Sequence, residues 1–130
     1  MPKAPVISLI EDDRFVRDSM KRLMRSLGYG VETFSSAADF LASSQLAETA
    51  CLIADIQMPE ISGIELHRRL VDAGRAVPTI LVTAYPDDEA HIQALRDGVV
   101  GYLSKPVDEK RLVECLRDAL RRSEAHEENS

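Results

Sequence analysis

The chain is poor in aromatic and sulfur-containing residues. Its 130 residues include no tryptophan, two cysteines and 5% aromatic residues in all. The two cysteines, Cys51 and Cys115, form no CxxC pair and show no other spacing typical of a structural metal site. We therefore expect two buried or half-buried thiols in a reducing compartment rather than a disulfide framework.

Long apolar stretches are also missing. No run approaches the ~20 residues that cross a bilayer, and the N-terminal Met-Pro-Lys-Ala-Pro lacks the apolar segment of a signal peptide. We therefore expect a cytoplasmic protein that does not associate with membranes. A net charge of −6 and a pI near 5.0 disfavour a general nucleic-acid-binding surface, which needs a basic stripe.

The length fits one domain with a real core, and short and long apolar patterns alternate along it. Short runs rich in Val, Ile and Leu lie at 6–10, 51–54 and 79–82, with weaker runs at 31–34 and 100–103. Stretches with helical spacing or helix-start signals follow at 16–27, 36–41, 63–72, 87–97 and 107–122. Five strand–helix pairs predict an α/β fold, a parallel sheet with helices on both faces. The polar segment 123–130 is expected to fray.

Polar residues stand at the carboxyl ends of the predicted strands. Glu11, Asp12 and Asp13 follow the first strand. Farther along lie Asp55, Thr83 and the pair Ser104-Lys105. Each alone is most simply a turn former or a helix cap. Because ligands of open α/β sheets bind outside the carboxyl ends of the strands, the joint set predicts a site at one rim.

The residue types at this rim indicate phosphate chemistry. Clustered carboxylates need a cation, and an oxygen-only set with few protein ligands suits Mg²⁺, which usually also meets a phosphate. Thr83 could donate to a phosphoryl oxygen and Lys105 could pair with it as a point charge. Asp55 could itself be a nucleophile that forms an aspartyl-phosphate. Such a transfer needs little beyond alignment and charge neutralisation.

The sequence resembles the receiver domain of a two-component response regulator. The resemblance covers 6–122 and rests on Ile10-Glu11-Asp12-Asp13, on Asp55-Ile56-Gln57-Met58-Pro59 with Gly63, on Thr83-Ala84 and on Lys105-Pro106. Each motif alone is weak, but their order and spacing are highly specific. The resemblance implies a flavodoxin-like, doubly wound, five-stranded parallel sheet of order 2-1-3-4-5 with five helices. The receiver domain would span 1–122, followed by a polar tail at 123–130.

The resemblance also implies a metal site. Arg17 stands five residues after Asp12, where the family often has Arg, and so places the metal-binding acid pair at Glu11 and Asp12. Asp55 would be the phosphoacceptor. Asp12, Asp55 and the backbone carbonyl of Gln57 would ligate Mg²⁺ directly, and Glu11 would act mainly through a metal-bound water.

The remaining motifs imply how phosphorylation is sensed. Thr83 and Lys105 would contact the phosphoryl group with help from the backbone N–H of Ala84, and the Lys105–Pro106 bond is often cis in this family. On phosphorylation the Thr83 hydroxyl would move toward the phosphoryl group while Tyr102 turns inward. The output surface would comprise the fourth helix, the fifth strand and the fifth helix. Tyr85 departs from the small residue often found two positions after the Thr and leaves the lifetime of the phosphate open.

Partners also follow from the resemblance. The phosphodonor would be a histidine kinase or a phosphotransfer protein, and phosphorylation could drive homodimerisation. The segments 34–41 and 83–87 resemble the FixJ-type subgroup, whose receivers usually precede a helix-turn-helix DNA-binding domain. No such domain is present in these 130 residues, so we expect either an excised receiver of a transcription regulator or a stand-alone one. The domain would not be an enzyme beyond its own Mg²⁺-dependent phosphorylation and autodephosphorylation.

Three other interpretations remain. An aspartate-nucleophile phosphatase of the haloacid dehalogenase type would need a second Asp where Gln57 stands. A flavodoxin-like nucleotide or flavin binder would need a Gly-rich phosphate loop where the acids follow the first strand. A receiver-like docking module that is never phosphorylated is compatible with the sequence, although the complete set of acids, Thr and Lys argues against it. His67, His91 and His126 are expected to be solvated surface residues.

Overall fold

The computed structural model describes residues 5–129, with side chains through Glu124. Five parallel strands form one sheet in the order β2-β1-β3-β4-β5, as predicted. The strands are β1 (Val6–Ile10), β2 (Gly30–Phe34), β3 (Thr49–Asp55), β4 (Thr79–Thr83) and β5 (Gly101–Ser104). The helices are α1 (Arg14–Ser26), α2 (Ala37–Leu41), α3 (Gly63–Asp72), α4 (Asp88–Arg96) and α5 (Glu109–Asn129). The sheet and its five helices confirm the predicted fold class.

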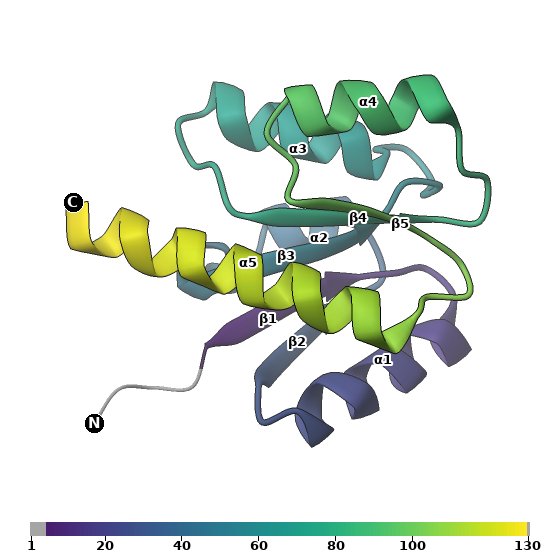
Figure 1. The fold of residues 1–130 in the computed structure, drawn as a ribbon, viewed down its shortest axis with the longest axis horizontal. Helices are drawn as coiled ribbons and strands as arrows, with labels where there is room; N and C mark the ends of the chain where they lie inside the picture. The colour runs from purple at the N-terminus through teal and green to yellow at the C-terminus, as the bar shows by residue number, and fades with distance from the viewer. Residues whose placement is uncertain (1–4, 130) are drawn as a thin grey trace.

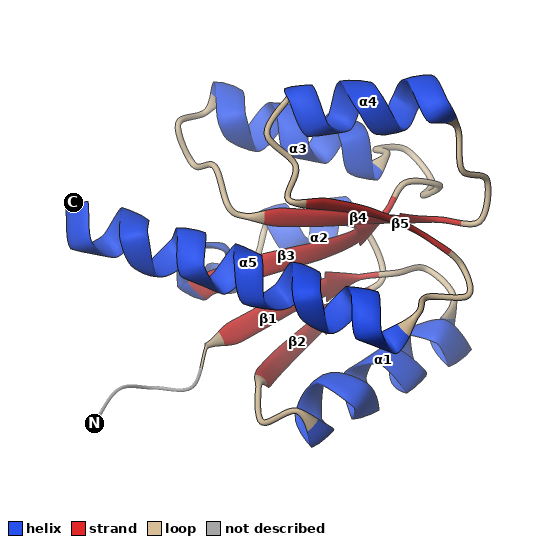
Figure 2. Ribbon diagram, in the orientation of Figure 1, coloured by secondary structure: helices blue, strands red, loops and turns tan. Residues whose placement is uncertain are grey.

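The helices cover the sheet on both faces. Figure 1 shows α1 and α5 on one face and α2, α3 and α4 on the other. Figure 2 shows the strands pointing the same way, so that the loops after β1, β3, β4 and β5 lie at one edge of the sheet. That edge carries the polar residues singled out by the sequence.

Each face of the sheet has its own hydrophobic core. On the first face, side chains from β1, β3 and β4 pack against α1 and α5, with Met24, Leu112 and Leu116 fully buried. On the second face, α2, α3 and α4 contribute a core that includes Phe40 and Leu66, both fully buried. The strands β3 and β4 are buried along most or all of their length, which explains their unbroken apolar sequences.

Local signals set most helix boundaries. Asp13, Ser62 and Asp87 cap the first turns of α1, α3 and α4, each accepting backbone N–H groups with its side chain. Gly28, Gly74 and Gly98 follow the same three helices with positive φ angles of 92°, 71° and 99°. Because glycine adopts this backbone conformation without strain, these residues act as the predicted helix stops.

Two local features differ from expectation. The α5 helix continues to Asn129, whereas the sequence predicted its end near Arg122 and a frayed tail. The segment contains neither glycine nor proline, so nothing in it interrupts the helix. A 3₁₀ helix, η1 (Ser44–Glu48), precedes β3 and was not predicted. Neither feature touches the polar edge of the sheet. None of the helices in the described part of the chain is both long and apolar enough to cross a bilayer.

Candidate functional site

Strand register brings the predicted site residues together. Ile10 pairs with Ala54, so Glu11 and Asp55 leave the sheet side by side. Thr83 pairs with Ser104 on the next two strands, and Lys105 follows immediately. Parallel strands end at the same edge, so residues that are distant in sequence converge there.

Lys105 bridges two buried carboxylates at this edge. Its Nζ lies 2.6 Å from Glu11 Oε1 and 2.6 Å from Asp55 Oδ2. The side chains of Glu11 and Asp55 are 2% and 6% exposed, and that of Lys105 is 22% exposed. The Lys105–Pro106 peptide bond is cis, as the resemblance implied. Burial lowers the pKa of Lys105, but the hydrogen bonds and charges of Asp55 and Glu11 raise it overall, so the ammonium form is favoured.

The carboxyl group of Glu11 is held in an unfavourable environment. Burial and the neighbouring Asp55 raise its pKa from 4.5 to about 7, although Lys105 acts in the opposite direction. Glu11 Oε2 is buried without a hydrogen-bond partner, and it is the one such side-chain oxygen in the part of the chain that the structure describes. A bound cation beside this oxygen would satisfy it.

The three predicted acids fit a divalent cation. Glu11, Asp12 and Asp55 each offer a carboxylate oxygen, and these oxygens lie within 4.8 Å of one another. Asp12 is exposed, so it can rotate toward an entering ion. An all-oxygen set of this size, beside an oxygen that lacks a hydrogen-bond partner, matches the chemistry of Mg²⁺. Gln57 lies two residues beyond Asp55 in the loop after β3, where its carbonyl was predicted to be a further ligand.

Asp13 and Arg17 support the loop between β1 and α1. The Asp13 carboxylate accepts the backbone N–H groups of Phe15 and Val16 and caps α1. The guanidinium of Arg17 donates to the carbonyl oxygen of Glu11 at 2.8 Å. Asp13 is therefore engaged locally, and the acids free to hold a cation are Glu11 and Asp12, the pair that Arg17 indicated in the sequence.

Thr83 is the last residue of β4, at the carboxyl end of the strand, and it is fully buried. Its hydroxyl donates to Gln57 Oε1 at 2.8 Å and accepts the backbone N–H of Tyr85 at 2.9 Å. The backbone N–H of Gln57 donates to Asp55 Oδ1 at 2.9 Å. Thr83 is thus linked to Asp55 through Gln57. No motif or spacing in the sequence predicts the contact of the Gln57 side chain with Thr83.

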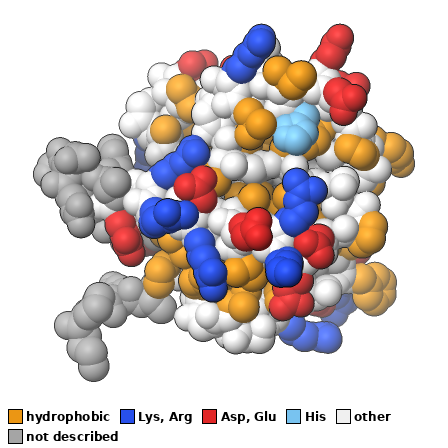
Figure 3. Space-filling view, in the orientation of Figure 1, with side chains coloured by type: hydrophobic (Ala, Val, Ile, Leu, Met, Phe, Trp, Pro, Cys, Tyr) orange, Lys and Arg blue, Asp and Glu red, His pale blue; other side chains and the backbone are white. Residues whose placement is uncertain are grey.

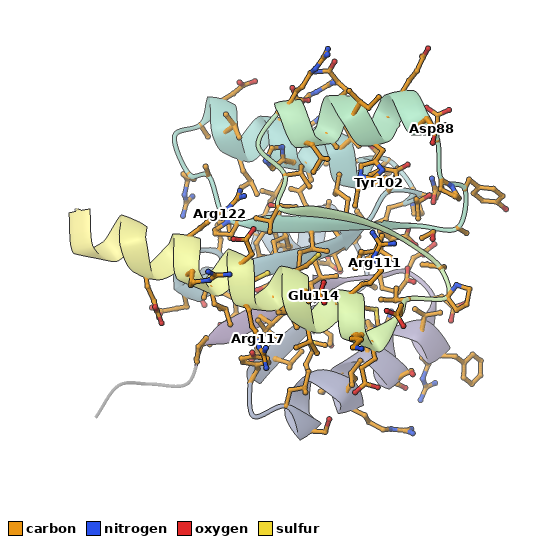
Figure 4. The ribbon with its side chains drawn as sticks, in the orientation of Figure 1. Asp88, Tyr102, Arg111, Glu114, Arg117 and Arg122 are labelled. Atoms are coloured by element: carbon orange, nitrogen blue, oxygen red, sulfur yellow. The ribbon has the colours of Figure 1, made fainter. Side chains whose placement is uncertain are left out.

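Tyr102 is a residue of β5, and its side chain is buried against α4. Its hydroxyl accepts the backbone N–H of Asp87 at 3.1 Å, and the ring of His91 stacks on it with centroids 4.7 Å apart and planes 11° from parallel. Figure 4 shows Tyr102 beneath α4, near the start of that helix at Asp88. Tyr85, by contrast, is 74% exposed.

The histidine prediction was only partly right. His67 is 5% exposed on the inner side of α3, so its expected place on the surface was wrong. Burial lowers its pKa and favours the neutral ring. His91 is half-buried on Tyr102, and the side chain of His126 lies outside the described residues.

Charges of both signs cover the exposed side of α5. Figure 3 shows basic and acidic side chains interleaved on this face of the molecule. Arg111, Glu114 and Arg117 are exposed along the helix (Figure 4), and Arg122 pairs with Asp118 at 3.3 Å. This pattern matches a solvated helix rather than a nucleic-acid-binding stripe, as the overall charge suggested.

Comparison with known proteins extends the resemblance to named relatives. The response regulator protein TodT of Pseudomonas putida is 36% identical over 119 residues, which cover 92% of this chain and 52% of TodT. The transcriptional regulatory protein FixJ of Bradyrhizobium diazoefficiens is 33% identical over 118 residues, which cover 91% of this chain and 58% of FixJ. The chain thus spans about half the length of these relatives.

Solved structures of response regulators superpose on the chain. The response regulator StyR superposes with a TM-score of 0.89 at 31% identity, over 98% of this chain and 64% of that one. The structure titled FixJ-N superposes with a TM-score of 0.80 at 27% identity, over 92% of this chain and 96% of that one. The family model of the response regulator receiver domain matches residues 7–117. The chain therefore belongs to the response regulator receiver domain family of two-component signalling.

Proposed function

We propose that Asp55 accepts a phosphoryl group from a histidine kinase or a phosphotransfer protein. The observation that carries this proposal is the position of Asp55, whose buried carboxylate is bridged by Lys105 and lies beside Glu11 and Asp12. A carboxylate oxygen of Asp55 would bond to phosphorus as the bond from phosphorus to the donor's imidazole nitrogen breaks, and the nitrogen keeps the electron pair.

The surrounding side chains would neutralise the charge that is transferred. Mg²⁺ held by Glu11, Asp12 and Asp55 would supply positive charge to the phosphoryl oxygens. The ammonium of Lys105, already at Asp55 Oδ2, lies within reach of an oxygen of the incoming group. Thr83 could donate its hydroxyl hydrogen to another, once that hydrogen leaves Gln57. These residues align and neutralise, and no side chain needs to remove a proton.

The response would reach the surface formed by α4, β5 and α5. Tyr102 on β5 contacts both the cap of α4 and His91, so a change in its packing would be transmitted to α4. Because this chain matches only 58% of the transcriptional regulator FixJ, we infer that the surface controls an output domain or a partner in transcription. The chain would turn over no substrate apart from its own phosphoryl group, and it would act in the cytoplasm, where kinases present their phosphohistidine.

Intact mass measurement with acetyl phosphate and Mg²⁺ tests the proposal. We expect one added phosphoryl group on the parent protein and none on Asp55→Asn, which keeps the size of the side chain but removes the nucleophile. Addition to both proteins would place the phosphoacceptor elsewhere. No addition to either, with a purified histidine kinase as an alternative donor, would contradict the function and favour a docking module.

Sedimentation tests the expected dimer. Beryllium fluoride with Mg²⁺ mimics the phosphoryl group, so a phosphorylation-dependent dimer should approach twice the mass of the untreated protein. The same mass in both states would exclude dimerisation as the response.

A further inference from the structure

Gln57 links the phosphoacceptor to the buried threonine through two hydrogen bonds. Its backbone N–H donates to Asp55 Oδ1 at 2.9 Å, and its side-chain Oε1 accepts from the Thr83 hydroxyl at 2.8 Å. The side chain of Gln57 lies at the surface, whereas Thr83 is fully buried. An exposed amide therefore holds a hydroxyl that has no access to solvent.

The hydroxyl of Thr83 has no second hydrogen to give. A hydroxyl group donates once, and this donation is made to Gln57 Oε1. An acceptor site on the same oxygen is taken by the N–H of Tyr85. A phosphoryl group on Asp55 would present a charged acceptor to the same hydroxyl. The amide of Gln57 and the phosphoryl oxygen would then compete for one hydrogen.

We propose that the Gln57 side chain is a positioning residue that holds the Thr83 hydroxyl in the unphosphorylated arrangement and opposes its move to the phosphoryl group. This inference rests on the proposed function, because it concerns the regulation of the same site. The phosphoryl oxygen wins the competition since hydrogen bonds to charged acceptors are stronger than those to neutral ones. The hydrogen bond from Thr83 to Gln57 must nevertheless be broken first, and this reduces the free energy that Thr83 contributes to the phosphorylated state.

Release of the Thr83 hydroxyl from Gln57 would affect α4 through the loop between Thr83 and Asp87. The Tyr85 N–H donates to the same hydroxyl oxygen, and two residues later Asp87 caps α4 and donates its N–H to Tyr102. Moving Thr83 would therefore change the hydrogen bond at Tyr85 and shift the loop that leads to the cap. The amide resonance of Tyr85 reports this hydrogen bond directly, in the metal-free protein as well as in the liganded one.

Gln57→Met tests the inference because methionine has a similar length but lacks the carbonyl oxygen. We expect Gln57→Met to bind beryllium fluoride with Mg²⁺ about three- to tenfold more tightly than the parent, which is the range of one hydrogen bond. The Tyr85 amide resonance should also shift in the metal-free variant. An unchanged affinity or an unchanged amide resonance would overturn the inference.

A double-mutant cycle with Thr83→Val separates the action through Thr83 from a direct one. Valine keeps the shape of threonine without the hydroxyl, so the gain from Gln57→Met should vanish in the Thr83→Val background. A gain that persists there would overturn the inference, because Gln57 would then act on the phosphoryl site without Thr83. A parent protein that binds no beryllium fluoride and gains no phosphoryl mass would instead overturn the proposed function.

Discussion

The ammonium of Lys105 lies at 2.6 Å from one carboxylate oxygen of Glu11 and from one of Asp55, and so joins the carboxyl ends of β5, β1 and β3. Two carboxylates this close would repel each other in a buried site, and the ammonium between them offsets that repulsion. Glu11 nevertheless keeps a raised pKa and an oxygen without a partner. The metal-free site is therefore compensated only in part, which leaves it responsive to a cation.

Removal of the ammonium should destabilise the metal-free fold. Lys105→Met replaces the ammonium with an apolar side chain of similar size and leaves the buried Asp55 carboxylate, beside a Glu11 that takes up a proton near pH 7, without its cation, at a cost on the order of 3 kcal/mol. Urea unfolding at pH 7 in EDTA measures the loss. Lys110→Met changes an exposed lysine on α5 and should alter the free energy of unfolding by less than about 0.5 kcal/mol. Equal effects of the two substitutions would contradict a bridging role for Lys105.

Mg²⁺ should stabilise the fold through Asp12. A concentration tenfold above the Kd adds about 1.4 kcal/mol, or roughly 3–5 °C in Tm for a domain of this size. Asp12→Asn should lose most of this response. Asp13→Asn is the matched control, since Asp13 caps α1 and should keep the response to Mg²⁺. An Asp12→Asn protein that responds like the parent would argue against Asp12 as a ligand.

The stability of the metal-free protein should depend on pH through Glu11. Its pKa is about 7 in the folded state against 4.5 ordinarily, so between these values the folded protein holds a proton that the unfolded chain releases. Stability therefore falls as the pH rises from about 4.5 to 7, by up to about 3 kcal/mol from this group.

Glu11→Gln provides the measurement for this pH dependence. Glutamine resembles the protonated glutamate, so the variant should gain stability relative to the parent as the pH rises from 5 to 7.5 in EDTA. Saturating Mg²⁺ favours the charged carboxylate and should reduce this difference in the free energy of unfolding. A difference that is constant across the pH range would contradict the raised pKa.

The sequence predicted which residues would lie together because strand ends determine most of their positions. The apolar runs located the strands, and their order along a parallel sheet required Glu11, Asp55, Thr83 and Lys105 to meet at one edge. The family motifs added what spacing alone could not, namely the register of the acid pair that Arg17 marks. In the structure, the guanidinium of Arg17 donates to the backbone carbonyl of Glu11, and the role of the acid pair stays a prediction.

The missed features depend on packing that no short pattern contains. The Gln57 side chain reaches Thr83 because the loop after β3 turns it toward β4, and loop direction is not encoded by periodicity. His67 is buried because its position on α3 faces the core despite a polar ring. His91 reaches Tyr102 only through the way α4 lies over β5. For His67 the residue type suggested the surface and packing buried it, whereas for Gln57 and His91 packing added a contact that the residue type did not indicate.

The stack of His91 on Tyr102 should hold the tyrosine inward. His91→Ala removes an aromatic contact worth about 0.5–1.5 kcal/mol and leaves in place the hydrogen bond from the Asp87 N–H to the Tyr102 hydroxyl. We expect the Tyr102 ring to become more mobile and its ring-proton resonances to move toward their values in unfolded chains. Because the chain has no tryptophan and only three tyrosines, these resonances can be assigned through single Tyr→Phe variants.

Ile92→Ala is the control for this last prediction. Ile92 follows His91 on α4 but is 53% exposed, so its truncation changes the helix without touching the stack. Its Tyr102 resonances should match those of the parent. If Tyr102 kept its parent resonances in His91→Ala as well, the Asp87 hydrogen bond and the surrounding core would suffice to hold the ring. The inward position of Tyr102 would then be independent of α4 side chains, and any control of it would have to come from the backbone of the loop between Thr83 and Asp87.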